Sequence, residues 1–233
     1  IATAMQGANS VCYIPARYKA DELEVGRQVV DSAKAAGLDH FLFCSAYHPQ
    51  IEALGHHWQK LRLEEYLIDS DLRYTVVQPS MFMQNIGVEW SSVADEGVYA
   101  RPYSPESKMN VIDTADLGDA IATILLDEQF WGATYELCGS TLLSHTEMAA
   151  IISEELGRQV KGVHRDLEEW KSWAVGRGWT DYAIDAYVHM CEHYDAHGYK
   201  FGNDVTLRAI IGRPANDYRS FIRSFIEARK SSI

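Results

Sequence analysis

The sequence predicts an α/β fold in which helices cover both faces of a parallel sheet. Apolar runs of strand length alternate with helix-length amphipathic segments over residues 10–79, which is the pattern of successive β-α-β units. The runs are continuously apolar, as in strands that are buried on both faces. Hydrophobic residues make up 47% of the 233 residues and charged residues 23%, which is the composition of an ordinary globular protein.

The first half of the chain supplies three strands and two helices. Apolar residues at helical spacing identify each helix, and β-branched or aromatic runs identify each strand. Gly37 is expected to end the first helix as its C′ residue. In chain order, the predicted elements are a strand at 10–15, a helix at 21–36, a strand at 40–45, a helix at 55–69 and a strand at 73–79.

The second half of the sequence predicts a less regular arrangement of strands and helices. Residues 81–110 contain scattered glycines and prolines and predict a loop-rich excursion with a short helix at 85–93. Ser144-x-x-Glu147 matches a capping box before a helix that should end at Gly157. The remaining predicted elements are a strand at 109–112, a helix at 116–127, a strand at 133–137 and a helical segment rich in Trp and Tyr from 158 onward.

These elements predict two parts. The sheet and its helices occupy residues 1–140, and a smaller, mostly helical lobe occupies residues 141–233. Residues 81–110 are expected to contribute to the cleft as well. Ligands bind at the carboxyl ends of parallel strands, so we expect the site beside 14–15, 45–47 and 78–80.

Charge and composition narrow the class of partner. Lys plus Arg total 21 against 33 Asp plus Glu, a formal net charge of −12, and no basic stripe is present, which argues against binding to nucleic acid. No apolar run approaches the roughly 20 residues that a membrane helix needs. The four cysteines form no C-x-x-C pair and predict free thiols in a reducing compartment. We therefore expect a cytoplasmic protein that acts on a small molecule.

The start of the chain resembles the end of a helix. Residues 1–8 predict the last turns of an amphipathic helix that stops at Gly7 and leads into the first strand. We therefore expect an N-terminal segment before Ile1. No G-x-G-x-x-G occurs anywhere in the sequence, so either the dinucleotide loop lies in that segment or a dinucleotide is not bound in the usual way.

One motif points to cofactor chemistry. His56-x-x-x-Lys60 places both side chains one turn apart on a single helix face. A lysine there could bond the ribose hydroxyls of a nicotinamide nucleotide and lower the pKa of a neighbouring proton donor. The alternative is an ordinary solvated helix face.

Other motifs point to different chemistry. His189-Met190-Cys191-Glu192-His193 matches H-x-x-E-H, and His197 extends its histidine row, so a zinc hydrolase is an alternative to incidental histidines. We expect no metal site. Neither a G-x-S-x-G elbow nor a G-x-x-x-x-G-K-[ST] loop is present. The aromatic residues of the lobe could line a pocket for a flat substrate or simply form its core: Trp170, Trp173, Trp179, Tyr182, Tyr187 and Tyr194.

Nearly the whole chain resembles the NmrA-like family, an atypical branch of the short-chain dehydrogenase/reductase superfamily. No single segment is diagnostic, but their order and spacing together are fairly specific. The resembling segments are MQGANSV at 5–11, GRQVVDSAKAAGL at 26–38, FLFCS at 41–45, His56-x3-Lys60-x4-Glu65-Tyr66-Leu67, LRYTVVQPSMF at 72–82 with Asn85, VID-x-x-DLG at 111–118, YEL-x-G at 135–139, 147–157 and HGY at 197–199.

The resemblance implies a Rossmann-type, doubly wound sheet that binds NADP(H) more readily than NAD(H), with the smaller lobe covering a cleft. Typical short-chain reductases use a Tyr-x3-Lys pair. Here Lys60 matches the lysine, whereas His56 stands in place of the tyrosine. This departure argues against ordinary alcohol or ketone reduction. Hydride transfer to an activated double bond remains compatible with His56 at this position.

The resemblance also implies the roles of individual residues. Lys60 and His56 are the expected catalytic residues, with Lys60 also holding the nicotinamide ribose. The expected cofactor-binding residues are Ile14, Pro15, Ser45, Ala46, Lys60, Gln78 and Pro79. The expected substrate-binding residues are Tyr47, Met81, Phe82 and Trp90. For each of them, ordinary packing at the end of the sheet is the alternative.

Three functions follow from these expectations. The leading one is an NAD(P)H-dependent oxidoreductase that reduces a small or medium-sized unsaturated organic substrate. The first alternative is a regulatory protein that binds the dinucleotide to sense redox state and catalyses nothing. The second is a cyclase or isomerase that uses the same scaffold without net redox chemistry.

Overall fold

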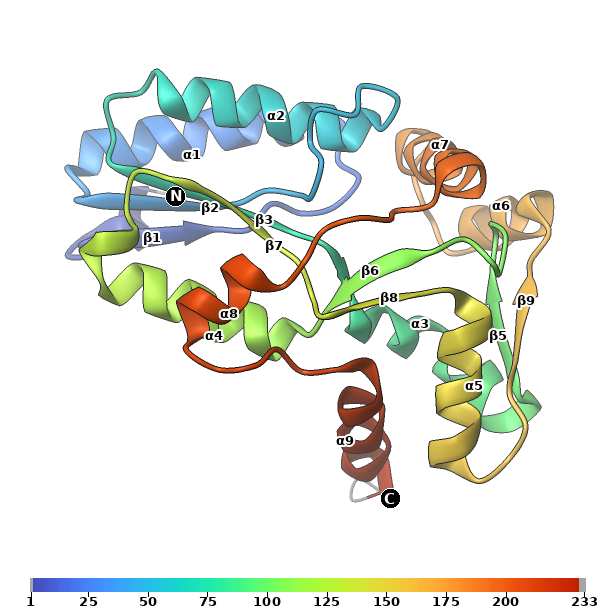
Figure 1. The fold of residues 1–233 in the computed structure, drawn as a ribbon. Coiled ribbons are helices and arrows are strands. Elements are labelled where there is room, and N and C mark those ends of the chain that lie inside the picture. The colour runs from blue at the N-terminus through green and yellow to red at the C-terminus, as the bar shows by residue number, and fades with distance from the viewer. Residues whose placement is uncertain (1, 231–233) are drawn as a thin grey trace.

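A four-stranded parallel sheet with the strand order β1-β2-β3-β7 organises the fold (Figure 1). The structure, a computed structural model, describes residues 2–230. Each neighbouring pair of strands is parallel, and all five residues of β2 are buried. The three strands predicted in the first half of the chain are confirmed. The strands are β1 (Ser10–Tyr13), β2 (His40–Cys44), β3 (Tyr74–Pro79) and β7 (Thr134–Leu137).

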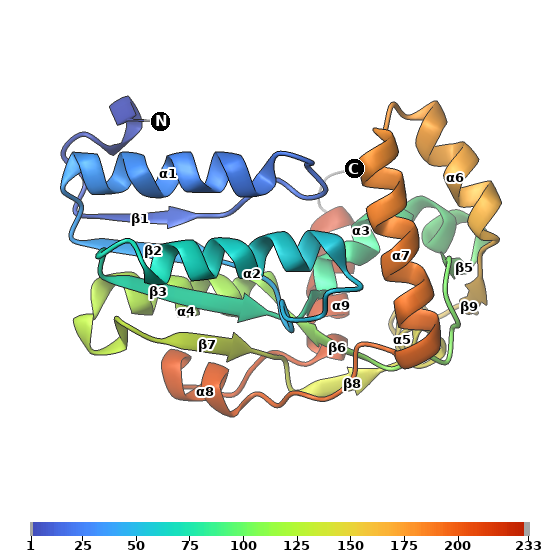
Figure 2. The same cartoon turned by 90° about the horizontal axis from the view of Figure 1, so that it is seen from above.

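Helices cover both faces of this sheet, as Figures 1 and 2 show. On one face, Val30 and Leu63 pack in a single cluster with Phe41 of β2. On the other face, Ala120 and Leu207 pack with residues of β2 and β3. The predicted doubly wound α/β fold is therefore confirmed. The first face is covered by α1 (Glu22–Ala36) and α2 (Gly55–Ile68), and the second by α4 (Thr114–Leu126) and α8 (Val205–Ile211).

The predicted helix ends are confirmed by backbone geometry. Gly37 follows α1 with φ +67° and Gly157 follows α5 (His145–Leu156) with φ +69°, both in the left-handed region that favours glycine. The Ser144 hydroxyl accepts a hydrogen bond from the Glu147 amide at 3.2 Å, and the Glu147 carboxylate accepts one from the Ser144 amide at 2.7 Å. This reciprocal pair is the predicted capping box.

A second group of elements lies beyond the carboxyl ends of β1, β2 and β3 (Figure 2). A three-stranded sheet pairs β4, β6 and β8, and a separate parallel pair joins β5 to β9. The strands are β4 (Met81–Phe82), β5 (Val98–Arg101), β6 (Met109–Ile112), β8 (Thr141–Leu143) and β9 (Lys161–His164). The helices are α3 (Ile86–Ser91), which continues as a π-helix over Ser92–Glu96, α5, α6 (Leu167–Gly176), α7 (Asp181–His197) and α9 (Tyr218–Lys230).

Two features of the second half differ from the sequence-based expectation. The β5–β9 ladder was not expected, because β9 lies near the surface and has no apolar run. Helix α8 returns from the predicted lobe to the sheet, where Leu207 is fully buried. The division of the chain at residue 140 stays a prediction.

Three further observations complete the fold. Ala2–Met5 forms a 3-10 helix and Gly7 has φ +76° where a helix end was expected, and Ile1 lies outside the described residues. Short 3-10 helices also occur at Met83–Asn85 and Glu128–Phe130. Across residues 2–230, no helix has the length and apolar character to cross a bilayer.

Candidate functional site

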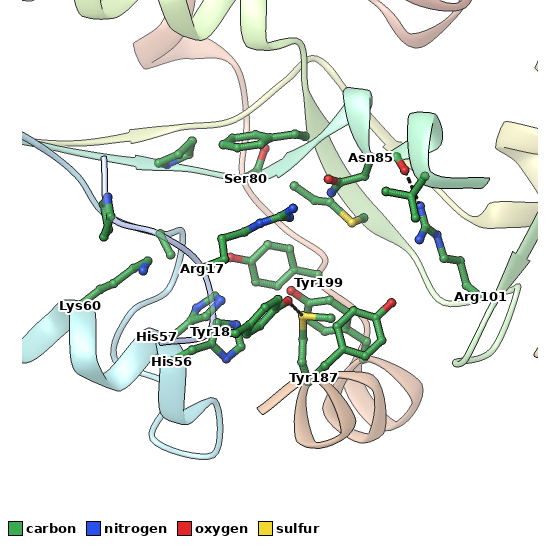
Figure 3. Close-up of a pocket in the computed structure, with 18 of the residues that line it drawn as sticks. Arg17, Tyr18, His56, His57, Lys60, Ser80, Asn85, Arg101, Tyr187 and Tyr199 are labelled. Atoms are coloured by element: carbon green, nitrogen blue, oxygen red, sulfur yellow. Dashed lines mark hydrogen bonds between the residues drawn. The ribbon is translucent and has the colours of Figure 1, made fainter. Parts of the chain in front are cut away.

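A cavity of about 250 Å³ lies where the carboxyl ends of β1, β2 and β3 face the second group of elements (Figure 3). Residues that directly follow these strands form one wall, as the rule for open parallel sheets predicts. Aromatic side chains of α6, α7 and the segment between them form the opposite wall. The aromatic wall is Trp170, Trp173, Trp179, Tyr187 and Tyr194.

Most of the predicted site residues come together at this cavity, although they come from four separate stretches of the chain. Ile14 lies at the rim, with 64% of its surface exposed. The predicted residues that line the cavity are Ile14, Pro15, Ser45, Ala46, His56, Lys60, Pro79, Met81 and Phe82.

The other three predicted residues do not line it. The Gln78 side chain instead donates hydrogen bonds to both carboxylate oxygens of Glu64, at 3.0 and 2.9 Å. Tyr47 is buried, with its ring centroid 3.7 Å from that of His48. Trp90 packs against Phe225 of α9, at a centroid distance of 5.0 Å. Strand-end position alone therefore did not determine which side chains face the cavity.

Lys60 is held by an ion pair from the neighbouring helix. Its ammonium group contacts the carboxylate of Glu22 at the start of α1, and the two side chains are only 10% and 3% exposed. Burial raises the pKa of Glu22, although Lys60 opposes this shift. In the described part of the chain, this is the one hydrogen bond of the ammonium group, which has three N–H donors. Lys60 therefore has a fixed position and spare donors beside the cavity.

His56 and His57 are neutral at physiological pH. Burial, assisted by neighbouring His57, Lys60 and Arg17, lowers the pKa of His56 to about 2. Burial also lowers the pKa of His57 to about 4. The Nδ1 atom of His56 is buried without a hydrogen-bond partner among residues 2–230. A neutral imidazole can hydrogen-bond to a ligand but holds no additional proton.

The buried carboxylate of Glu64 fixes the end of β2. The Ser45 hydroxyl donates to Glu64, which also accepts the two bonds from Gln78 of β3. Burial raises the pKa of Glu64, while the hydrogen bonds from Ser45 and Gln78 lower it. The network links α2 to the ends of β2 and β3, so the position of Ser45 in the wall depends on this carboxylate.

The sequence did not predict several residues that line the cavity. Arg17 and Tyr18 follow β1 by only a few residues, so the strand-end rule could have identified them. Figure 3 shows the Arg17 side chain between Ser80 and Tyr18. Arg101 gave no comparable signal, since it comes from the unexpected strand β5. It is buried, pairs with Glu89 at 3.5 Å and donates to the Asn85 carbonyl at 2.8 Å.

The Trp- and Tyr-rich stretch of α6 and α7 forms both a packed core and part of the cavity wall. Trp170 is 4% exposed and stacks on Tyr187 at a centroid distance of 4.0 Å, yet both residues line the cavity. Tyr182 lies outside the cavity lining and accepts a hydrogen bond from Gln59. The two interpretations of this stretch are therefore compatible, because a packed aromatic cluster presents one side to the cavity.

The H-x-x-E-H motif lies on α7, mostly away from the cavity. Met190 lines the cavity, whereas the histidines and Glu192 do not. The rings of His193 and His197 are 4.8 Å apart. Among residues 2–230, no group of three or more His, Cys, Asp or Glu side chains is arranged to hold a metal ion.

Comparison with known proteins places the chain in a family. The profile of the NmrA-like family matches residues 1–211. The chain is 27% identical over 217 residues to an NAD(P)H azoreductase of Xenophilus azovorans, covering 89% of this chain and 72% of the relative. It is 25% identical over 220 residues to quinone oxidoreductase 2 of Escherichia coli (strain K12), covering 92% and 74%.

A solved structure supports the same assignment at the level of the fold. The NADPH-dependent quinone oxidoreductase of Escherichia coli, solved in complex with NADPH, superposes with a TM-score of 0.83 at 22% sequence identity. The alignment covers 97% of this chain and 79% of that one. The expected Rossmann-type fold is therefore confirmed. Together with the profile match over residues 1–211, these likenesses show that the chain belongs to the NmrA-like family.

Proposed function

We propose that the protein is an NAD(P)H-dependent oxidoreductase that reduces a small or medium-sized unsaturated organic compound. One observation supports this most strongly: a single cavity joins Ser45 at the end of β2 and Lys60 of α2 to an aromatic wall from the Trp- and Tyr-rich stretch. The first group suits a polar nucleotide and the second a flat organic molecule. The reductase activities named for the azoreductase and quinone oxidoreductase relatives support the same proposal.

The residues at the strand ends fit the nicotinamide half of the cofactor. Lys60 has spare N–H donors beside the cavity, and the Ser80 side chain is buried there. Such groups suit ribose hydroxyls and a carboxamide. When bound, the nicotinamide supplies a hydride. The sequence has no G-x-G-x-x-G loop, so we assign no residue to the pyrophosphate.

Each residue of the wall has a proposed role. Lys60 orients the ribose, and Ser45, held by Glu64, borders the nicotinamide. Gln78 acts indirectly, because it fixes Glu64 rather than facing the cavity. His56 is neutral and contacts the substrate through a hydrogen bond. The other proposed border residues are Ile14, Pro15, Ala46 and Pro79 for the cofactor and Met81 and Phe82 for the substrate.

The proposal also includes a preferred cofactor and a cellular compartment. We favour NADP(H) over NAD(H), with support from the NADPH complex of the structurally similar quinone oxidoreductase. The four cysteines are free, which supports function in a reducing compartment such as the cytoplasm.

The test combines a binding assay with turnover. NADPH and NADH are titrated into the protein by calorimetry, and NADPH oxidation is then followed with quinones, azo compounds and enones. We expect nucleotide binding and steady oxidation with at least one class of acceptor. Tight binding without oxidation of any acceptor would instead favour a redox sensor. Absence of nucleotide binding would leave only a non-redox use of the cavity.

A variant pair makes the test specific. Lys60→Ala should weaken NADPH binding and slow turnover at least tenfold, whereas Lys19→Ala, at an exposed position outside the cavity, should change neither. Because Lys60→Ala leaves Glu22 buried and unpaired, the double variant Glu22→Gln/Lys60→Met serves as a neutral, folded control. Unchanged binding and turnover in both Lys60 variants would refute the role of Lys60.

A further inference from the structure

Tyr18 has a left-handed backbone conformation that is unusual for a residue other than glycine. It lies in the turn between β1 and α1 with φ +55°, in the left-handed region that residues other than glycine rarely adopt. Such strained conformations persist only where the surrounding structure enforces them, and they cluster at ligand sites. In Tyr18 this conformation accompanies a side chain that lines the cavity.

Aromatic neighbours fix the ring of Tyr18. Its centroid lies 5.0 Å from that of His56, 5.9 Å from that of Trp179 and 6.0 Å from that of Tyr187. Figure 3 shows the ring between the two histidines and the aromatic side chains of α7. The ring is therefore held from two sides, and these contacts fix the position of the Tyr18 hydroxyl in the cavity lining.

The hydroxyl of Tyr18 has a poor partner. In the part of the chain that the structure describes, its one hydrogen bond goes to the sulfur of Met190, at 3.4 Å. A thioether is a weak acceptor. Burial raises the pKa of Tyr18 to about 12, although Arg17 opposes the shift, so the hydroxyl keeps its proton throughout the physiological range.

Two other tyrosine hydroxyls at the cavity have better partners. The Tyr199 hydroxyl donates to the backbone carbonyl of Tyr47, and the Tyr103 hydroxyl lies 3.3 Å from a ring nitrogen of His145. A ligand that displaced either partner would gain little binding free energy, because one good hydrogen bond would replace another. A ligand oxygen that displaced the thioether would replace a weak hydrogen bond by an ordinary one. Tyr18 is therefore better suited than these two to meet a ligand.

We propose that Tyr18 is a specificity-determining residue whose hydroxyl leaves Met190 and donates a hydrogen bond to a carbonyl-type acceptor on a flat aromatic ligand. The proposal rests on the proposed function, since it names the feature that the reductase recognises in its substrate. The ligand lies against the aromatic wall, and its acceptor atom faces the Tyr18 hydroxyl. Arg17 and His56 flank this position.

The test compares two ligands that differ only in the acceptor. 9-Fluorenone has a carbonyl oxygen, and fluorene has the same fused rings without it. Each is titrated without any nucleotide, and binding is followed by quenching of the tryptophan fluorescence, because Trp170, Trp173 and Trp179 line the cavity. The wild type should prefer fluorenone by about fivefold, which is the contribution of one neutral hydrogen bond.

Two variants with opposite expected effects make the outcome specific. Tyr18→Phe keeps the ring and should abolish the preference. Met190→Leu removes the competing acceptor and should increase fluorenone affinity about twofold or more, since a volume-conserving exchange leaves the packing intact. Tyr182→Phe, whose hydroxyl lies outside the cavity, is the matched control and should retain the preference.

Two results would overturn the proposal. One is a fluorenone preference that survives in Tyr18→Phe, and the other is a wild type that binds neither ligand. Because no nucleotide is present, these results are independent of the cofactor. NADPH titration of Tyr18→Phe completes the design: binding equal to that of the wild type is expected, and a failure of the wild type to bind NADPH would refute the oxidoreductase and not the subsite.

Discussion

The buried Glu22–Lys60 pair should act on stability and on function in separable ways. Its side chains are 3% and 10% exposed, so removing either partner leaves a charge with little access to water. Breaking a buried pair in this way costs about 3–5 kcal/mol of unfolding free energy. We expect the lower end, about 3 kcal/mol, because Lys60 also borders the cavity. For a protein of this size, that loss corresponds to a fall in melting temperature of about 6–12 °C.

The two single variants should differ in their pH dependence. In Lys60→Met the remaining Glu22 can become neutral, and its pKa, already raised by burial, rises further without the lysine. A carboxyl group whose folded-state pKa is raised favours folding at low pH and loses that advantage as pH rises through the folded pKa. Lys60→Met should therefore be most destabilised near pH 8 and recover towards pH 5, whereas Glu22→Gln should not recover.

The assay is urea unfolding of the wild type, both single variants and the double variant Glu22→Gln/Lys60→Met at several pH values. The double variant has no buried charge and should come within about 1 kcal/mol of the wild type or exceed it. It should nevertheless fail to bind NADPH normally. Additive losses in the double variant, or single variants as stable as the wild type, would refute the description of these residues as a buried, coupled pair.

Three further predictions concern other parts of the molecule. Burial, assisted by Arg101, lowers the pKa of His145 to about 3, so its contribution to stability is present above about pH 6.5 and is lost as pH falls. Between pH 6.5 and pH 5, the unfolding free energy of the wild type should fall by about 1.5 kcal/mol more than that of His145→Gln in urea titrations, and parallel curves would contradict this. Gly139→Ala would place Cβ 1.8 Å from a backbone oxygen of β6 and should lower the unfolding free energy by at least about 3 kcal/mol. Gly118→Ala, in open space on α4, should instead raise the unfolding free energy by about 0.5–1 kcal/mol, and urea unfolding of both glycine variants measures the two changes. Trp90→Ala removes a contact with α9 and should lower the unfolding free energy by about 2 kcal/mol without changing the KM for substrate. A raised KM would instead indicate that Trp90 contacts the substrate.

The regular elements of the sheet domain could be predicted because their signals are local. Strand β2 is a run of apolar residues, and helix α5 begins and ends with a capping box and a glycine. Strands β5 and β9 could not be predicted in this way. Lys161–His164 is a short, partly exposed stretch, and its pairing with β5 depends on residues about sixty positions away.

The candidate site was predictable in position but not in detail. The strand-end rule placed Ser45 and Pro79 at one edge of the sheet, the His56-x3-Lys60 motif identified Lys60, and the structure brings the three residues together. The same rule could not tell that Gln78 turns towards Glu64, because residues that alternate along a strand face opposite sides and the neighbouring helix decides which polar group they meet.

The α/β class, the order of the first strands and helices and the edge at which a ligand would bind could all be predicted without a structure. These follow from periodicity and from capping residues a few positions apart. The pairing of Lys60 with Glu22, 38 positions away, and the contact of Tyr18 with Met190, 172 positions away, became visible only in the folded chain. Contacts over such separations depend on how packed elements aim their side chains, which no local pattern specifies.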